Sequence, residues 1–269
     1  MRVISRKKGG IDSAKNEIKR RHRSHSQGKL TVVGIGPGSL DLLTLRAKKA
    51  IEKSSVIAGY KTYIALLGNL SQGKELISTG MTHEVERARQ AIDRAKAGCR
   101  VCLVSSGDPG VYGMAGLVLE LLREDERIEV EIIPGVMASS ASAAILGAPL
   151  MHDFAVISLS DLLTDLRLIE ERVEAAAKAD FVIALYNPKS KKRIEPFERA
   201  CNILMKHRNP QTPVGIVRDC EREGQSVRII LLKDLPEFKD IDMTTTIIVG
   251  NSASYVKGKY MITPRGYRL

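Results

Sequence analysis

The chain has 269 residues, of which 43% are hydrophobic and 4% are aromatic, so it can bury a sizeable core. Its formal charge of +11 is concentrated at the N-terminus. Residues 1–29 carry ten Lys and Arg against Asp12 and Glu17, which gives +8 and leaves only +3 for the other 240 residues. The body of the protein is therefore not strongly basic, and a nucleic-acid-binding function would rest on this tail alone.

Residues 1–29 show no sustained apolar periodicity, so this segment cannot bury enough surface to offset the entropy lost on ordering. We expect a disordered basic tail. It lacks the apolar run of a signal peptide, and no later run approaches the roughly 20 apolar residues that span a bilayer. These features predict a protein of the cytoplasm.

Four cysteines occur, and two of them, Cys99 and Cys102, have the C-x-x-C spacing of redox and zinc sites. Because they fall in an apolar segment that reads as a strand, their side chains should point to opposite faces. No second C-x-x-C is present to complete a zinc site. We therefore expect buried, reduced thiols and no metal.

Residues 31–39 read as an apolar strand that runs into a glycine-rich turn, Gly34 to Gly38, and residues 42–53 read as a helix. This order is typical of a nucleotide-binding α/β unit. The spacing is not that of a dinucleotide fingerprint, because Ser39 stands where its last glycine would be. Pro37 also lacks the N–H that a phosphate cradle uses. The turn predicts a ligand that approaches the backbone and need not carry phosphate.

Strands and helices alternate through most of the chain, which predicts α/β architecture with helices covering parallel sheets. In the first half we expect strands at residues 55–59, 100–105 and 129–133, and helices at 64–67, 84–97, 114–124 and 139–146. In the second half we expect strands at residues 153–158, 180–186, 214–218, 227–232 and 245–250, and helices at 169–179 and 196–207.

A break at residues 147–149 divides the chain into two α/β domains, residues 30–148 and 149–269. The first should contain a parallel-type sheet. The second should contain a mixed sheet, because strands follow one another there with little helix between them. The cofactor crevice is expected between the two domains.

Glycine- or proline-rich turns follow three strands of the first half: residues 34–38, 107–110 and 134–135. Ligands of open α/β sheets bind outside the carboxyl ends of the strands, so we expect these turns to meet at one small-molecule site. Asp108 could accept hydrogen bonds from a ligand or from its own turn, and the residues leave both open. No Walker lysine, H-E-x-x-H or nucleophile elbow is present, which favours group transfer from a reactive cofactor.

The first two turns, together with residues 43–47, resemble the tetrapyrrole methyltransferase superfamily, which binds S-adenosylmethionine between two α/β domains. Within it the chain resembles the C17-methyltransferases of precorrin-3B and of cobalt-factor III, from cobalamin biosynthesis. This closer resemblance is carried by residues 105–114, 146–154, 157–164, 185–188 and 263–267. It implies S-adenosylmethionine-dependent methylation of C17 with ring contraction, carried out by a homodimer.

The resemblance also implies the site. Cofactor contacts are expected at Pro37, Ser106, Gly107, Asp108, Val111, Met137, Ala138, Asn187, Gly215, Thr245 and Thr246. Proton transfers during ring contraction have four candidates, Tyr60, His152, Asp153 and Asp161. Substrate carboxylates have three candidates, Lys61, Arg193 and Arg218. The plainer alternatives are that His152 and Asp153 only shape the interdomain hinge and that the three cations are solvated surface charges.

The sequence departs from the superfamily at two positions. Ser39 stands where many members have an acidic residue. The stretch around Tyr60 replaces the one in which uroporphyrinogen-type relatives carry a proton-accepting aspartate, which makes Tyr60 the residue to test in that role. Two alternative functions stay open: a sister methyltransferase acting on another tetrapyrrole position or on diphthine, and a nucleic-acid-binding module that uses the basic tail.

Overall fold

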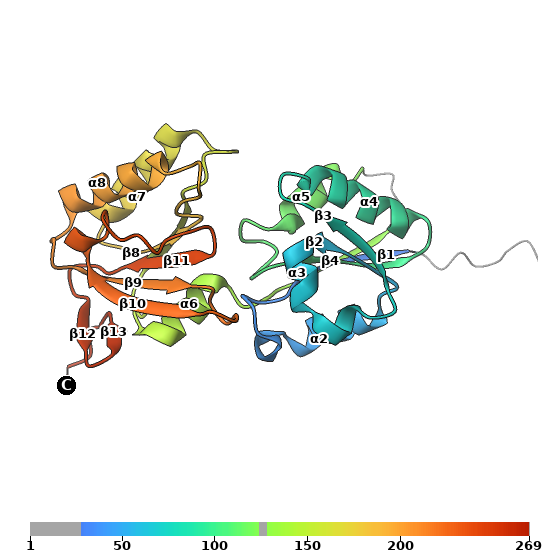
Figure 1. Cartoon of the computed structure of the whole chain (residues 1–269), viewed down its shortest axis with the longest axis horizontal. Coiled ribbons are helices and arrows are strands. Elements are labelled where there is room, and N and C mark those ends of the chain that lie inside the picture. The colour runs from blue at the N-terminus through green and yellow to red at the C-terminus, as the bar shows by residue number, and fades with distance from the viewer. Residues whose placement is uncertain (1–27, 124–127, 269) are drawn as a thin grey trace, which may run out of the picture.

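The computed structural model describes residues 28–123 and 128–268, so all but the end of the predicted tail lies outside it. Figure 1 shows two lobes, each built around a five-stranded sheet. The first lobe comprises residues 28–123 and 128–133, and the second lobe comprises residues 138–268. Among the described residues, every helix falls short of the length and apolar character that crossing a bilayer would require.

The sheet of the first lobe has the strand order β3-β2-β4-β1-β5, and all of its strand pairs are parallel. Its strands are β1 (Lys29–Gly34), β2 (Val56–Tyr60), β3 (Glu75–Thr79), β4 (Arg100–Ser105) and β5 (Glu129–Ile133). Apolar side chains of β1 and β4 are buried on both faces, as parallel sheets require. The predicted parallel sheet is confirmed. The edge strand β3 was not predicted.

Four helices cover this sheet: α2 (Leu45–Lys53), α3 (Lys61–Leu66), α4 (Glu84–Lys96) and α5 (Met114–Leu121). Helix α2 begins at Leu45 rather than at residue 42, because Oγ1 of Thr44 accepts a hydrogen bond from the N–H of Ala47 at 3.1 Å and caps it there. Helix α4 ends before Gly98, whose φ of +89° stops it as predicted.

The sheet of the second lobe has the strand order β10-β9-β11-β8-β7. Its strands are β7 (Phe154–Ser158), β8 (Val182–Tyr186), β9 (Pro213–Arg218), β10 (Ser226–Leu231) and β11 (Thr245–Val249). Only β7 and β8 pair in parallel, so the predicted mixed sheet is confirmed. Helices α7 (Leu166–Lys178) and α8 (Glu195–His207) cover one face, where Phe197 is the largest fully buried side chain.

The other face of this sheet is covered by α6 (Ala138–Leu146), which Figure 1 shows beside β9 and β10. Leu146 packs there with Val217 and Ile248. A small sheet follows, in which β6 (Gly147–Ala148) and β12 (Tyr255–Lys257) flank β13 (Tyr260–Ile262). The sequence placed α6 in the first domain. The domain boundary at residue 148 stays a prediction, and this packing favours an earlier one, near residue 134.

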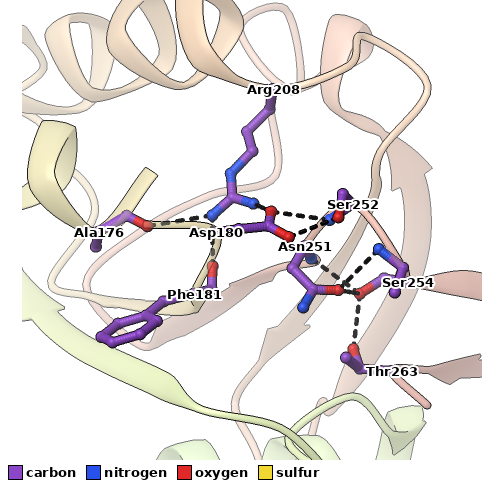
Figure 2. Close-up of polar contacts among 9 residues, drawn as sticks. Ala176, Asp180, Phe181, Arg208, Asn251, Ser252, Ser254 and Thr263 are labelled. Carbon is purple, nitrogen blue, oxygen red and sulfur yellow. Dashed lines mark hydrogen bonds and ion pairs between the residues drawn. The ribbon is translucent and has the colours of Figure 1, made fainter. Parts of the chain in front are cut away.

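A polar network fastens the C-terminal segment to the second sheet (Figure 2). The guanidinium of Arg208, whose side chain is 3% exposed, forms an ion pair with Asp180. Asp180 also accepts hydrogen bonds from the N–H of Ser252 at 3.0 Å and from its hydroxyl at 2.5 Å. The adjoining hydroxyls of Ser254 and Thr263 lie 2.7 Å apart. The network therefore links the start of β8 and the end of α8 to the residues that precede and follow the β12–β13 hairpin.

Candidate active site

Three turns lie at the carboxyl ends of β1, β4 and β5: a first turn (residues 34–38), a second turn (106–113) and a third turn (134–137). Gly36 and Gly107 exchange backbone hydrogen bonds of 3.2 and 2.8 Å, which joins the first turn to the second. A Cβ on Gly34 would stand 2.6 Å from the nitrogen of Gly135, and one on Gly135 would stand 2.2 Å from the oxygen of Gly107. Only glycine permits these approaches. The predicted meeting of the three turns is confirmed.

Asp108 holds two of these turns. Its Oδ1 accepts a hydrogen bond from the N–H of Gly110 at 2.8 Å, within the second turn. Its Oδ2 accepts one from the N–H of Gly135 at 3.0 Å, across to the third turn. Both carboxylate oxygens therefore stabilise the backbone, and a contact between Asp108 and the cofactor stays a prediction.

The second turn leaves space beside the start of α6, where a main-chain N–H is open to a ligand. Gly107 has a φ of +65°, and a Cβ built there would find nothing nearer than the nitrogen of Ala138 at 3.7 Å. Ala138 begins α6 after Met137, which provides no side-chain cap. Among the residues that the structure describes, no acceptor takes the N–H of Ala138, whereas the next N–H, that of Ser139, is bonded to the hydroxyl of Tyr186 at 2.7 Å. A helix start of this kind attracts a carboxylate or another acceptor.

Tyr112 extends from the second turn to β7 in the other lobe. Its hydroxyl donates to the carbonyl oxygen of Val156 at 3.0 Å and accepts from the N–H of Ser158 at 3.1 Å. Its ring lies 5.9 Å, centroid to centroid, from that of Tyr186, and burial raises the pKa of Tyr186. Sequence reasoning missed both tyrosines as bridging residues, because neither contact is local.

Arg222 makes a second bridge between the lobes. It lies in the β9–β10 turn (residues 219–225), and its Nε donates to the carbonyl oxygen of Pro37 at 2.7 Å. Its Nη2 donates to Oγ of Ser106 at 3.1 Å. In the sequence Arg222 stands between two glutamates and looks like an exposed surface charge, so no local signal could have singled it out.

The loops after β7 and β8 form the second-lobe side of the site. Nδ2 of Asn187, whose φ is +51°, donates to Oγ of Ser158 at 3.0 Å. Arg193 donates to the carbonyl oxygens of Leu159 at 2.5 Å and Asn187 at 2.7 Å, and its Nε lies 3.8 Å from a carboxylate oxygen of Asp161. Arg193 thus holds both loops. Its role as a substrate contact stays a prediction.

The other second-lobe candidates lie in the sheet. Oγ1 of Thr245 accepts from the N–H of Asp242 at 3.0 Å and lies 3.1 Å from Oδ1 of the same residue. Thr246 points to the opposite face, the one that carries α6, because neighbouring strand residues alternate. Gly215 shares that face, and a Cβ on it would stand 2.3 Å from a methyl group of Leu146. The two threonines therefore lie on opposite faces of the sheet, and the missing side chain of Gly215 lets α6 pack closely against it.

Among the proton-transfer candidates, Tyr60 ends β2 at the same edge as the three turns. Its ring packs edge-on against Tyr63 at 5.2 Å, and burial raises the pKa of Tyr63. Lys61 follows and is exposed. The guanidinium of Arg87, 4% exposed, donates to the carbonyl oxygen of Gly80 at 3.3 Å and lies 3.7 Å from a carboxylate oxygen of Glu84.

His152 and Asp153 lie elsewhere. They are exposed residues before β7, where the N–H of Asp153 bonds Nδ1 of His152 at 2.9 Å. Tyr112 bonds Val156 and Ser158 of that strand, so at ~3.3 Å per residue Asp153 lies about 10 and 17 Å along the strand from these two contacts. This placement favours the alternative that His152 and Asp153 only shape the interdomain hinge. Arg218 ends β9, where its Nε lies 3.7 Å from a carboxylate oxygen of Asp219.

Within residues 28–123 and 128–268, no three His, Cys, Asp or Glu side chains are arranged to hold a metal ion. All four cysteines are free thiols. Cys99 precedes β4, whereas Cys102 is 1% exposed inside it, and burial raises the pKa of Cys102 to about 12. The C-x-x-C pair is thus not a reactive dithiol.

Comparison with known proteins identifies the family. The family model of the tetrapyrrole (corrin/porphyrin) methylases matches residues 29–236. The chain is 50% identical over 247 residues to the cobalt-factor III methyltransferase of Priestia megaterium, covering 90% of this chain and 46% of that protein. It thus spans about half the length of that relative. It is 49% identical over 241 residues to a probable cobalt-factor III C(17)-methyltransferase of Salmonella typhimurium, covering 89% of this chain and 100% of that protein.

Solved structures agree. The methyltransferase CobJ superposes with a TM-score of 0.83 at 38% identity, over 88% of this chain and 100% of the other. The cobalt precorrin-4 methyltransferase CbiF superposes with a TM-score of 0.68 at 26% identity, over 84% and 95%. The predicted two-domain α/β fold is therefore the fold of these enzymes, and the chain belongs to the tetrapyrrole (corrin/porphyrin) methylase family.

Proposed function

We propose that the chain is an S-adenosylmethionine-dependent C-methyltransferase that methylates C17 of cobalt-factor III or precorrin-3B, with ring contraction, in cobalamin biosynthesis. The observation that carries this proposal is the 49% identity to the Salmonella typhimurium relative, which extends over 100% of that protein. The two alternative functions drawn from the sequence, a sister methyltransferase and a nucleic-acid-binding module, have no comparable support.

The residues at the three turns suit S-adenosylmethionine, which when bound would supply the methyl group. The N–H of Ala138 and the hydroxyl of Ser106 would hold its polar parts, Gly107 leaves room for it to approach the backbone, and the N–H of Ala138 at the start of α6 suits a carboxylate. The neighbouring residues with expected contacts are Pro37, Asp108, Val111 and Met137. Few charged side chains take part, which explains why the sequence offers few charged candidates.

The attacking carbon belongs to the tetrapyrrole, so the chain's own contribution is to hold two reactants about 3–3.5 Å apart and to exclude water. Tyr112 and Arg222 serve this purpose by joining the two lobes. Tyr60, at the same edge as the three turns, is the best-placed group for a proton transfer during ring contraction.

The tetrapyrrole carries carboxylates, and basic side chains near the crevice would bind them. Lys61 is exposed beside Tyr60 and is the best-placed of the three predicted clamps. Arg218 ends β9, and Arg193 already donates to two carbonyl oxygens. We therefore expect Lys61 to contribute most to binding the substrate carboxylates, then Arg218, then Arg193.

We also propose a homodimer in the cytoplasm. The loop after β7 exposes two leucines, Leu162 at 72% and Leu163 at 100%, which a partner subunit would cover. The free thiols agree with a reducing compartment.

The test is an assay of purified protein with S-adenosylmethionine and either cobalt-factor III or precorrin-3B, with products analysed by mass spectrometry. We expect one added methyl group, located at C17 by NMR with a ¹³C-labelled methyl donor, and faster turnover of one of the two substrates. A methyl group on another carbon would favour the sister enzyme, and no product from either substrate would refute the proposal.

A further inference from the structure

We propose that Arg222 is a positioning residue that clasps the second lobe onto two ligand-facing turns of the first lobe. Its Nε donates to the carbonyl oxygen of Pro37 at 2.7 Å and its Nη2 donates to Oγ of Ser106 at 3.1 Å. The acceptors belong to the first and second turns and lie 185 and 116 positions away in sequence. One side chain therefore fixes both turns relative to the β9–β10 turn.

The contact surface is built for this approach. A Cβ on Gly38 would stand 2.4 Å from Cγ of Arg222 and 2.4 Å from the carbonyl oxygen of Glu221, so only glycine leaves room. The β9–β10 turn has two non-glycine residues in the left-handed region, Asp219 at φ +49° and Glu221 at φ +58°. Such strain persists only where surrounding contacts hold it. Here the N–H of Arg222 bonds the carbonyl oxygen of Asp219 at 2.9 Å, and the N–H of Glu221 bonds Oε1 of Gln225 at 2.8 Å.

The two contacts suit arginine better than lysine. Nε and Nη2 lie on one edge of a planar fork and reach two acceptors at once, whereas a lysine ammonium is a point donor. Nε and Nη2 together hold acceptors from two different turns, which a single point donor cannot do.

The clasp should set how tightly a ligand binds between the lobes. A ligand that contacts both lobes binds in proportion to the population of the closed arrangement. Loss of the Arg222 contacts lowers that population, while each lobe keeps its own core. For its binding readout alone, this inference rests on the proposed use of S-adenosylmethionine.

The first experiment measures the affinity for S-adenosylhomocysteine by calorimetry. Arg222→Met should weaken binding by about 10- to 100-fold, the loss expected for hydrogen bonds from a charged donor, and Arg222→Lys should restore part of it. The control is Arg228→Met, an exposed arginine of the adjoining strand, which within the part of the chain that the structure describes donates only to the carbonyl oxygen of Val227, at 2.8 Å. It should bind like the wild type.

A double-mutant cycle tests the contact itself. If Arg222 and Ser106 interact, the effects of Arg222→Met and Ser106→Ala should not multiply, and the double variant should bind more tightly than the product of the two single losses predicts. An unchanged affinity in Arg222→Met, or effects that multiply fully, would overturn the clasp. A role in stability alone would lower the melting temperature and leave the cycle additive.

The second experiment needs no ligand. In Arg222→Met, amide hydrogen exchange of peptides covering residues 36–38 and 106–113 should be faster by at least ~10-fold, because a contact that holds these turns is gone. Arg228→Met should exchange like the wild type. If the wild type fails to bind S-adenosylhomocysteine, the proposed cofactor is wrong. The exchange rates still test the Arg222 contact, and unchanged rates in Arg222→Met would overturn it.

Discussion

Oδ2 of Asp108 accepts a hydrogen bond from the N–H of Gly135 at 3.0 Å, and this bond joins the turns after β4 and β5. The same carboxylate closes its own turn through Gly110 at 2.8 Å. A residue that the resemblance assigns to cofactor binding therefore also builds the surface on which the cofactor is expected to lie.

Asp108→Ala removes both accepted bonds and leaves two N–H groups without their partner. We expect a loss of about 1–3 kcal/mol in the free energy of unfolding, measured by urea denaturation, and weaker binding of S-adenosylhomocysteine. Asp108→Asn keeps one carbonyl acceptor and should lose less. Asp93→Ala, an exposed acidic residue of α4, is the control and should unfold like the wild type. Equal stability of all four proteins would contradict the bridging role.

Gly135→Ala tests the meeting of the three turns. The new methyl group would stand 2.2 Å from the carbonyl oxygen of Gly107, a backbone atom that cannot swing aside. We expect a loss of about 1–3 kcal/mol on thermal unfolding and reduced ligand binding. Gly116→Ala is the matched control, because nothing lies within 4 Å of a Cβ built there inside α5. That variant should be neutral or slightly more stable.

The ion pair of Figure 2 predicts a stability change far from the crevice. Asp180 has a φ of +59°, a conformation that asparagine also tolerates, so Asp180→Asn removes the charge and keeps the backbone. Arg208 is then buried without its partner charge. Because the Asp180 side chain is 44% exposed, we expect the free energy of unfolding to fall by about 1–3 kcal/mol, less than for a fully buried pair. Chemical denaturation should show this loss while ligand affinity stays unchanged.

The hydrogen bonds to Glu131 should make the stability of the protein depend on pH. Hydrogen bonds from Lys29 and then from Arg46 hold the pKa of Glu131 below its ordinary value. A carboxylate with a lowered pKa stabilises the fold above its unfolded-state pKa, and this contribution is lost as the pH falls through the folded-state value. Glu131→Gln should therefore be less stable than the wild type at neutral pH, and the difference should vanish in acid. A difference that does not change between pH 7 and pH 2 would contradict this account.

Local patterns predicted the parts of the fold that local chemistry determines. The stop at Gly98, the glycine turns and the mixed second sheet follow from conformational freedom and element order. The start of α2 at Leu45 could also have been read, because Thr44 precedes the run of helix formers. The packing of α6 could not, since its alanines and serines give little amphipathic pattern and Leu146 finds its partner at Gly215, far along the chain.

The site divides in the same way. Each of the three turns is a continuous stretch of sequence and could be predicted. The bridges between the lobes depend on contacts such as that of Arg222 with Pro37, which lie 185 positions apart. Tyr112 reaches β7 across 44 and 46 positions. Without a fold, nothing separates such side chains from solvated ones, and this is why the sequence did not single out Arg222.

Tyr60 offers the sharpest test of catalysis. It ends β2 beside the three turns, and its ring is fixed edge-on against Tyr63 at 5.2 Å, so Tyr60→Phe removes the hydroxyl and keeps the packing. If that hydroxyl transfers a proton during ring contraction, kcat should fall by about 10²–10⁴-fold while the affinity for S-adenosylhomocysteine stays unchanged. Tyr63→Phe is the matched control and should retain kcat. His152→Ala should retain it too, because His152 lies at the far end of β7; a large fall in kcat for His152→Ala with none for Tyr60→Phe would reverse the two assignments.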